Sequence, residues 1–259
     1  MRLDCYLAQN GYADSRERAK RLILAGAVTV DGRVINKPAL EIEGEPKIAV
    51  TEEEFVGRGG EKLKAALSLF GVDPKGLRAL DVGASTGGFT HCLLEKGAAS
   101  VVALDAGCDQ LHPKLRADAR VTNVEKYNAR ELSACDVGTF DLVVMDVSFI
   151  SATYILPRFP EVMERGALAI VLIKPQFEAG RAAIGKNGLV KSKKERFAAV
   201  LRVLECASTI DFGCFGFALS PIEGGDGNRE YIAAFRRGGA SLVDAAYVKR
   251  IIDGENERR

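Results

Sequence analysis

The chain has 259 residues, of which 47% are hydrophobic and 27% are charged, which is the composition of an ordinary globular protein. Its 36 basic and 35 acidic side chains give a net charge of +1, so any surface that binds nucleic acid must be a local basic patch. The N-terminal residues lack the apolar stretch of a signal peptide, and the longest aliphatic run, residues 167–173, is too short to span a bilayer. The six cysteines form no C-x-x-C pair, which argues against a zinc site and indicates a reducing, cytoplasmic setting.

Residues 1–56 predict a small α+β domain. Asp14-Ser15 has the residue types that cap the start of a helix, and Gly26 has the type that ends one. Asp31-Gly32 favours a type I′ turn between two short strands. The expected elements are a helix with Leu3 and Leu7 on one face, a helix at 16–24, and strands at 28–30, 33–35 and 47–50.

The polar run Thr51–Glu54 is expected to be a linker, so residues 57–259 form a second domain. After a helix at 61–70, apolar strands alternate with helical segments, which is typical of a parallel sheet with crossover helices. The strands are predicted at 77–81, 100–105, 142–146, 168–174, 212–218 and 231–235. The last two are close together and indicate an antiparallel end, and a helix is expected from Ser241. The fold class is therefore α/β, a Rossmann-like sheet with a small α+β domain ahead of it.

A glycine-rich loop follows the first strand of this sheet and opens a helix. Glycines let a backbone turn sharply and approach a ligand closely, and the helix start offers free N–H groups. The G-x-x-x-G-G spacing differs from the dinucleotide fingerprint G-x-G-x-x-G. The acid before the loop, Asp81, suits the ammonium group of S-adenosylmethionine better than a pyrophosphate. The predicted cofactor-binding residues of this segment are Asp81, Gly83, Ser85, Thr86, Gly87, Gly88 and Phe89.

Two residues after later strands complete the expected nucleoside site. Asp105 ends the second strand, where an acid typically accepts hydrogen bonds from ribose hydroxyls. Asn128 follows the next short strand and either borders the adenine or is an ordinary exposed loop residue.

Four charged residues are expected to meet at one edge of the sheet. Asp146 and Lys174 each follow an apolar strand, and ligands of open α/β sheets lie outside such strand ends. Glu230 precedes a strand that reaches the same edge if it is antiparallel, and Lys62 begins the helix before the first strand. Taken singly, each residue is as well explained by a surface salt bridge. Together they suit a methyl transfer, because a desolvated lysine amine can take the proton of a weakly acidic ribose hydroxyl.

The order Lys62, Asp146, Lys174, Glu230 resembles the K-D-K-E tetrad of the FtsJ-type 2′-O-ribose methyltransferases. Five short stretches of the sequence resemble the TlyA family of haemolysin-A-type rRNA methyltransferases. They begin at Arg58, Asp81, Asp146, Lys174 and Gly225. The N-terminal part, with Arg2-Leu-Asp4 and Ser15-Arg16, resembles an S4 RNA-binding domain. The resemblance implies 2′-O-methylation of ribosomal RNA, usually at cytidine, with the tetrad as the catalytic residues and Lys174 as the central one. The family often has Ser where this chain has Gly57, a difference expected to affect the linker more than the chemistry.

Two basic clusters are candidates for RNA contact, since phosphate contacts give sequence-independent affinity. The first cluster lies on the second N-terminal helix. A run of charges is usually a solvated helix face, but the S4 resemblance favours RNA contact for this cluster. The second follows Lys174, and a solvated surface explains it equally well. The assigned RNA-binding residues are Arg2, Arg16, Arg18, Lys20, Arg21, Arg58, Lys191, Lys193 and Lys194, and Lys186 and Arg196 belong to the second cluster.

Three alternatives compete with an rRNA methyltransferase. A membrane-acting haemolysin is suggested by the family's name, and the lack of a spanning segment argues against it. A non-catalytic RNA-binding factor is disfavoured by the intact tetrad. A small-molecule methyltransferase is disfavoured because such an enzyme has no evident need for an N-terminal RNA-binding domain. No metal is required for the expected reaction.

Overall fold

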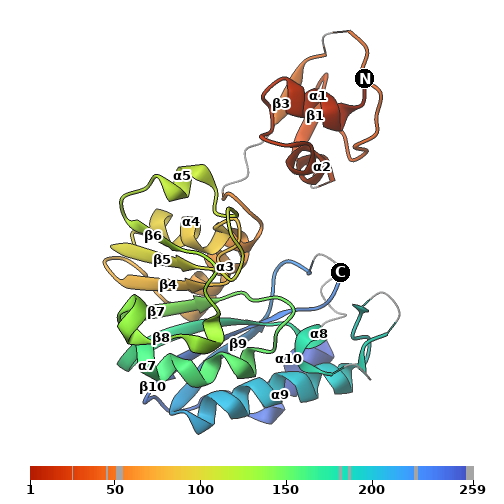
Figure 1. Cartoon of the computed structure of the whole chain (residues 1–259). Helices are drawn as coiled ribbons and strands as arrows, with labels where there is room; N and C mark the ends of the chain where they lie inside the picture. Colours follow the sequence, from red (N-terminus) through yellow and green to blue (C-terminus); the bar gives the residue numbers. More distant parts are fainter. Residues whose placement is uncertain are drawn as a thin grey trace. The chain divides into compact units, whose positions relative to one another are not determined.

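The computed structural model describes residues 1–24, 26–44, 46–50, 55–180, 183–185, 188–224 and 227–254, without the side chain of Arg21. Outside these residues lie the predicted linker Thr51–Glu54, Lys186 of the second basic cluster, Gly225 and Asp226 of the last motif, and residues 255–259. Contacts within the chain divide it into two compact units, Met1–Glu54 and Phe55–Arg259. Figure 1 shows the elements of both units.

The first unit packs two helices against a small sheet. Its elements are α1 (Leu3–Gln9), α2 (Arg16–Leu24), β1 (Val28–Val30), β2 (Arg33–Val34) and β3 (Ile48–Val50). Asp31 and Gly32 both have positive φ angles, 50° and 78°, as the predicted type I′ turn requires. β3 pairs with the other side of β1, so the strand order is β2-β1-β3. Leu3, Leu7 and Val28 are among the fully buried residues of its core, which confirms the predicted elements.

The second unit contains a seven-stranded sheet with the order β6-β5-β4-β7-β8-β10-β9. The strands are β4 (Arg78–Val82), β5 (Ser100–Leu104), β6 (Val121–Val124), β7 (Phe140–Met145), β8 (Met163–Ile173), β9 (Phe212–Leu219) and β10 (Tyr231–Arg237). β4 to β8 pair in parallel, whereas β10 is inserted antiparallel between β8 and β9. The predicted α/β class and the antiparallel end are confirmed.

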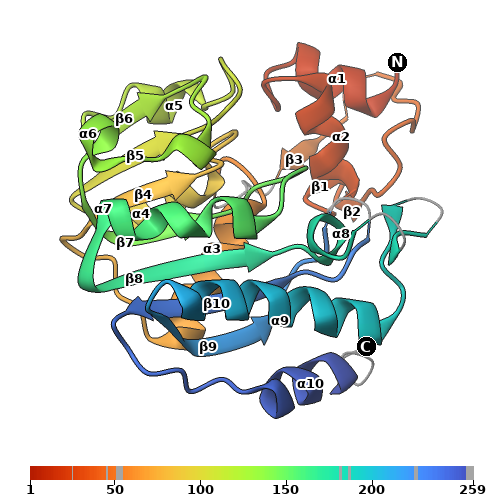
Figure 2. The same cartoon turned by 60° about the horizontal axis from the view of Figure 1, so that its bottom comes forward.

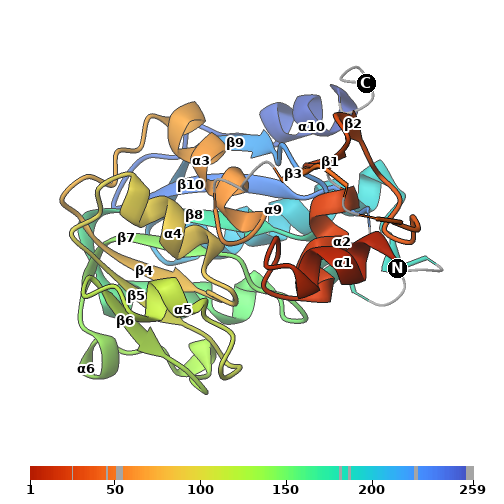
Figure 3. The ribbon, with the colours of Figure 1, turned by 90° about the horizontal axis from the view of Figure 1, so that it is seen from above.

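Helices cover both faces of this sheet. The larger ones are α3 (Gly59–Phe70), α4 (Gly88–Glu95), α9 (Lys193–Thr209) and α10 (Ala245–Asp253), and the short ones are α5 (Pro113–Arg116), η1 (Ala129–Glu131), α6 (Ala134–Val137), η2 (Ala152–Tyr154), η3 (Leu156–Arg158), α7 (Phe159–Val162) and α8 (Pro175–Glu178). α3 and α4 pack on one face, seen in front in Figure 3, and α7 and α9 pack on the other, seen in front in Figure 2. The last helix begins four residues after the predicted Ser241, because Asp244 caps it by accepting a 2.7 Å hydrogen bond from the N–H of Tyr247.

Candidate active site

A cavity of about 410 Å³ lies at the C-terminal ends of β4, β5 and β7. We call it the cofactor cavity. The strand order changes direction between β4 and β7, and this switch point is where ligands of open α/β sheets bind. The volume lies within the range of about 300–1,000 Å³ that is usual for small-molecule sites. Its lining residues include Gly83, Ser85, Asp105, Tyr127, Asn128, Asp146, Ser148 and Phe149.

Four of the predicted cofactor-binding residues line this cavity. Gly83 has a φ of 84°, and a Cβ there would lie 2.6 Å from the carbonyl oxygen of Asp146, so only glycine fits between the two strand ends. The Asp105 carboxylate accepts hydrogen bonds from the N–H groups of Ser85, at 2.8 Å, and Gly107, at 2.7 Å. Asn128 accepts from the N–H of Arg130 at 3.1 Å, so its amide is fixed at the cavity wall.

The second half of the glycine-rich loop is closely packed against its neighbours. Thr86, Gly87, Gly88 and Phe89 are absent from the cavity lining. A Cβ on Gly87 would lie 2.3 Å from a side-chain methyl group of Leu115, and one on Gly88 would lie 3.0 Å from the carbonyl oxygen of Gly57. Phe89 is buried in the core beside α3. The two glycines let α4 approach its neighbours closely, and cofactor binding by these four residues stays a prediction.

Asp81 lies at the end of β4, before the glycine-rich loop, as the sequence predicted. Its carboxylate is fully buried, and Oδ2 accepts hydrogen bonds from the N–H and the hydroxyl of Thr90, at 2.9 and 2.7 Å. Oδ1 is buried without a hydrogen-bond partner among the described residues, and burial raises the pKa of the group to about 7. The contact of Asp81 with an ammonium group stays a prediction, and Oδ1 is the oxygen that has no other partner among the described residues. Asp81 is within electrostatic range of Asp105 and Asp146, which both line the cavity.

Lys174 and Asp146 form an ion pair at the carboxyl edge of the sheet. Lys174 Nζ lies 2.6 Å from Asp146 Oδ1 and donates a hydrogen bond of 2.9 Å to the hydroxyl of Ser148. Lys174 follows β8, and the other two residues follow β7, so the parallel pairing of these strands brings them together. Asp146 and Ser148 both line the cofactor cavity, and the lysine amine is thereby held beside it.

Lys62 and Glu230 form a second ion pair, 2.5 Å long and buried on both sides. The antiparallel register aligns Tyr231 with Ile173, so Glu230 reaches the same edge as Lys174, as the sequence predicted. A Cβ on Gly224 would lie 2.6 Å from Glu230 Oε1, so a larger residue there would displace the carboxylate. The four predicted tetrad residues thus occur as two ion pairs at one edge of the sheet.

Phe149 is a feature of the site that the sequence reasoning did not assign. Its side chain is 92% exposed and its φ is +65°, an unfavourable backbone conformation for a bulky residue. Its ring contacts the ring of Phe177 at a centroid distance of 5.3 Å, and Lys174 Nζ lies 6.0 Å from the Phe177 centroid. An aromatic residue three positions after Asp146 was the available signal. The exposed ring therefore stands at the cavity wall, in contact with the ring that lies next to the lysine.

Two buried polar residues that hold the site loops were also missed. Glu178 accepts a hydrogen bond from the hydroxyl of Ser151. Asn228, in the last motif, accepts a 3.1 Å hydrogen bond from the N–H of Val190 and donates one of 3.0 Å to the carbonyl of Gly188. It therefore ties the loop before Glu230 to the segment before α9. Both residues lie in strings that resemble the family, and their partners are too distant in sequence to be inferred from spacing.

Comparison with known proteins is decisive for the family. Residues 55–237 match the model of the FtsJ-like methyltransferases, and residues 1–45 match the S4 domain. The chain belongs to the FtsJ-like methyltransferase family. It is 42% identical over 239 residues to the 16S/23S rRNA (cytidine-2′-O)-methyltransferase TlyA of Mycobacterium tuberculosis, covering 91% of this chain and 89% of TlyA.

Two further relatives agree with this assignment. Hemolysin A of Brachyspira hyodysenteriae is 40% identical over 242 residues, covering 91% of this chain and 99% of that protein. A solved structure of a hemolysin-named protein from Streptococcus thermophilus has a TM-score of 0.80 at 35% identity, covering 99% of this chain and 96% of the other. The predicted resemblance to the TlyA family, the fold class and the methyltransferase assignment are confirmed.

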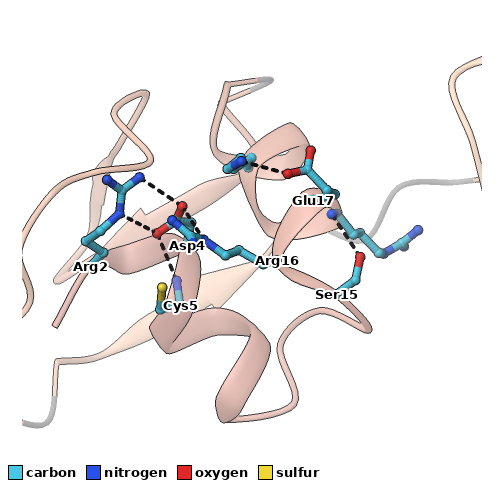
Figure 4. A network of polar contacts seen from close by, with 8 residues as sticks. Arg2, Asp4, Cys5, Ser15, Arg16 and Glu17 are labelled. Atoms are coloured by element: carbon cyan, nitrogen blue, oxygen red, sulfur yellow. Dashed lines mark hydrogen bonds and ion pairs between the residues drawn. The ribbon is translucent and has the colours of Figure 1, made fainter.

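The S4 domain of this FtsJ-like methyltransferase carries a polar network around one buried carboxylate (Figure 4). Asp4 is fully buried and pairs with Arg2 and Arg16, each at 3.0 Å, and these arginines hold its pKa well below its usual range. Both arginine side chains remain about half exposed, whereas Lys20 is paired with Glu17 at 2.6 Å. The predicted cluster is therefore present on α2, with part of its charge already balanced within the domain.

The second basic cluster is smaller than the sequence suggested. Arg196 is buried and donates hydrogen bonds to the carbonyls of Val190 and Lys191, so it is a structural residue and not part of an RNA-binding surface. Lys193 donates a 2.7 Å hydrogen bond to the last turn of α10. The remaining predicted residues outside the S4 domain are exposed, namely Arg58, Lys191 and Lys194. Arg18, on α2, is half-buried.

The described part of the chain also bears on membranes and metals. It contains no helix that is both long and apolar enough to cross a bilayer. Nor do these residues include a group of three or more His, Cys, Asp or Glu side chains suited to hold a metal ion.

Proposed function

We propose that this protein transfers the methyl group of S-adenosylmethionine to the 2′-hydroxyl of a ribose in ribosomal RNA, with cytidine as the nucleoside. The single observation that carries the proposal is the Lys174–Asp146 ion pair of 2.6 Å at the wall of the cofactor cavity. The family assignment and the reaction for which the M. tuberculosis relative is named support the same chemistry. The S4 domain supports RNA as the substrate class.

The cofactor cavity suits a cationic nucleoside such as S-adenosylmethionine. Asp105 and Asp146 line it, and Asp81, with an unpaired buried oxygen, is within electrostatic range of both, so its charges favour a positive ligand. We assign Asp105 to the ribose hydroxyls and Asn128 to the adenine, with Gly83 and Ser85 providing close backbone contact. The negative charge of Asp81 would then attract the methionine part of S-adenosylmethionine electrostatically. When bound, S-adenosylmethionine supplies an electrophilic methyl group on a positively charged sulfur.

Lys174 is the proposed general base. With S-adenosylmethionine bound, the ribose O2′ would bond to the methyl carbon as the carbon–sulfur bond breaks, and Lys174 would take the hydroxyl proton after releasing the proton that pairs it with Asp146. Asp146 and Ser148 fix the position of that amine, at 2.6 and 2.9 Å, and the aligned approach supplies much of the rate. We propose that the Lys62–Glu230 pair, at the same edge of the sheet, helps to position the ribose. The exposed ring of Phe149 offers a stacking surface for the target base.

RNA binding is assigned to both parts of the chain. We propose residues 1–56 as the RNA-binding domain, through Arg2, Arg16, Arg18, Lys20 and Arg21, and residues 57–259 as the catalytic domain. Arg58, Lys191, Lys193 and Lys194 would add phosphate contacts beside the catalytic site. A substrate of this kind means that the protein works in the cytoplasm, on ribosomal RNA or ribosomal subunits.

The test is mapping of 2′-O-methyl marks on ribosomal RNA from cells with and without the protein. A mark that appears with the protein and is absent with Lys174→Ala supports the proposal. Purified protein should reproduce the mark with labelled S-adenosylmethionine. RNA that carries no new mark, with the protein expressed and folded, contradicts it.

A further inference from the structure

A second cavity, of about 770 Å³, adjoins the cofactor cavity. We call it the side cavity. Phe149 and Ile150 line both cavities, so the two share a wall that begins three residues after Asp146. Arg130, Tyr154, Gln176 and Arg202 line the side cavity and not the cofactor cavity. None of these four residues has a role in the proposed methyl transfer.

An exposed aromatic ring and a guanidinium stand together at this cavity. The Tyr154 side chain is 63% exposed, so its ring is accessible at the cavity wall. The guanidinium carbon of Arg130 lies 5.5 Å from the centroid of this ring. Unpaired bases stack on such aromatic and guanidinium surfaces in RNA-binding proteins, whatever the base.

The polar groups of the side cavity complete a site for a nucleotide. The side-chain oxygen of Gln176 is buried and has no hydrogen-bond partner among the described residues, which is rare unless a ligand or water provides a donor. Arg130 and Arg202 are exposed cations, and Arg202 donates to the backbone carbonyl of Glu178. The Glu178 carboxylate, which also belongs to the wall, is buried and engaged by Ser151 and Ala152. The accessible charge is therefore positive, as a phosphate requires.

We propose that the side cavity binds a single-stranded nucleotide that neighbours the methylated one in the RNA. This inference rests on the proposed function. The base would stack on Tyr154, an amino or imino group of the base would donate to Gln176, and the phosphate would lie at Arg130 and Arg202. With the target base on Phe149, the strand would pass from the cofactor cavity to the side cavity over their shared wall. The enzyme would thereby require its target in an unpaired segment of at least two nucleotides.

The experiment compares kinetics of full-length variants on an RNA that the wild-type protein methylates. Tyr154→Ala should raise the KM for RNA about tenfold, from the loss of one stacked base, with kcat and the Kd for S-adenosylmethionine unchanged. Tyr154→Phe keeps the ring and should restore the wild-type KM. Arg130→Ala should lower the slope of log affinity against log salt by about one. Matched controls are Leu242→Ala and Arg165→Ala, whose side chains are exposed and line neither cavity.

Cross-linking supplies a second measurement that does not depend on turnover. RNA carrying 4-thiouridine next to the target should cross-link to the peptide that contains Tyr154. A KM for Tyr154→Ala equal to that of Leu242→Ala, or cross-links that map elsewhere, overturns the side-cavity proposal while methylation by the wild-type protein stands. A wild-type protein that methylates no RNA overturns the proposed function itself, so the two failures are distinguishable.

Discussion

The carboxylate of Glu178 accepts a hydrogen bond of 2.7 Å from the backbone N–H of Ala152, and so joins the loop after β7 to the turn after β8. The same two segments carry Asp146 and Lys174, which form the ion pair. Along both segments, the contacting rings of Phe149 and Phe177 lie between this ion pair and the hydrogen bond of Glu178. Glu178 is therefore expected to position the ion pair without contacting the substrate.

Replacing Glu178 tests this positioning role. Glu178→Ala leaves the buried N–H of Ala152 unpaired and should cost about 1–3 kcal/mol in the free energy of unfolding. We expect kcat to fall at least tenfold, with the Kd for S-adenosylmethionine unchanged, because the lysine amine loses its alignment. Glu178→Gln keeps an acceptor and should recover most of kcat. Equal losses in both variants, measured by single-turnover methylation and urea unfolding, would contradict the positioning role.

Lys174→Met removes the proposed base and should lower kcat about 100-fold to 10,000-fold, the range usual for general base catalysis. Calorimetry should give a Kd for S-adenosylmethionine no higher than that of the wild-type protein, because Lys174 does not line the cofactor cavity and its removal leaves the negative charge of Asp146 there without a partner. Lys96→Met, an exposed lysine at the end of α4, is the control. A kcat equal to that of this control would remove Lys174 from the mechanism.

The buried pair of Lys62 and Glu230 should matter for stability as well as activity. Glu230→Leu leaves a buried ammonium group without its partner and should destabilise the protein by about 3–5 kcal/mol. Lys62→Met combined with Glu230→Leu should cost less than either single change, since no lone charge remains. The exposed pair Arg158 and Glu161 is the control, where Glu161→Leu should cost at most about 1 kcal/mol. Additive losses in the double variant would speak against a coupled pair.

Asp81 should give stability a characteristic dependence on pH. Its pKa of about 7 in the folded protein is above its ordinary value, so between about pH 4 and pH 7 the folded state holds a proton that the unfolded state releases. Its contribution to stability is therefore present at low pH and falls as the pH rises to 7, by at most about 1.4 kcal/mol per pH unit. Asp81→Asn cannot titrate and should lose this slope in urea unfolding at pH 5 to 8. Asp253→Asn, at an exposed acid, should keep it.

The same titration should appear in cofactor binding. A cation near Asp81 favours the ionised carboxylate, so S-adenosylmethionine should bind more tightly as the pH rises from 6 to 8, with release of protons. Calorimetry in buffers with different ionisation enthalpies measures that release. An unchanged proton count in Asp81→Asn would assign the titration to another group.

Asp4 should control RNA affinity through the arginines that it holds. Asp4→Asn makes the S4 domain more positive by one charge, yet we expect weaker RNA binding because Arg2 and Arg16 lose their fixed orientation. Glu17→Gln makes the same change in charge on α2 and should strengthen binding slightly. Filter binding over a range of salt concentrations separates the two effects. Tighter binding by both variants would show that charge alone decides.

Local pattern determined much of this protein. Capping residues, a two-residue turn and apolar runs are set by neighbours a few positions apart, and for that reason most strands of both units were predicted nearly in place. The long helix α9 was not assigned, and β8 begins five residues before its predicted start at residue 168. The strand ends also followed, since an apolar run stops where a charged residue such as Asp146 or Lys174 begins. The identity of the candidate charged residues therefore follows from the order of residues along the chain.

Tertiary structure alone decided how those residues are paired and which way they face. The insertion of β10 between β8 and β9 depends on contacts between segments that are distant in sequence, and it sets Glu230 against Lys62, 168 positions away. Packing in the folded protein also buries Asp81 and Arg196 and leaves Phe149 exposed. Hydrophobicity assigns a residue type its average preference, whereas the packing of a particular site determines whether a charge is buried with partners or left in solvent.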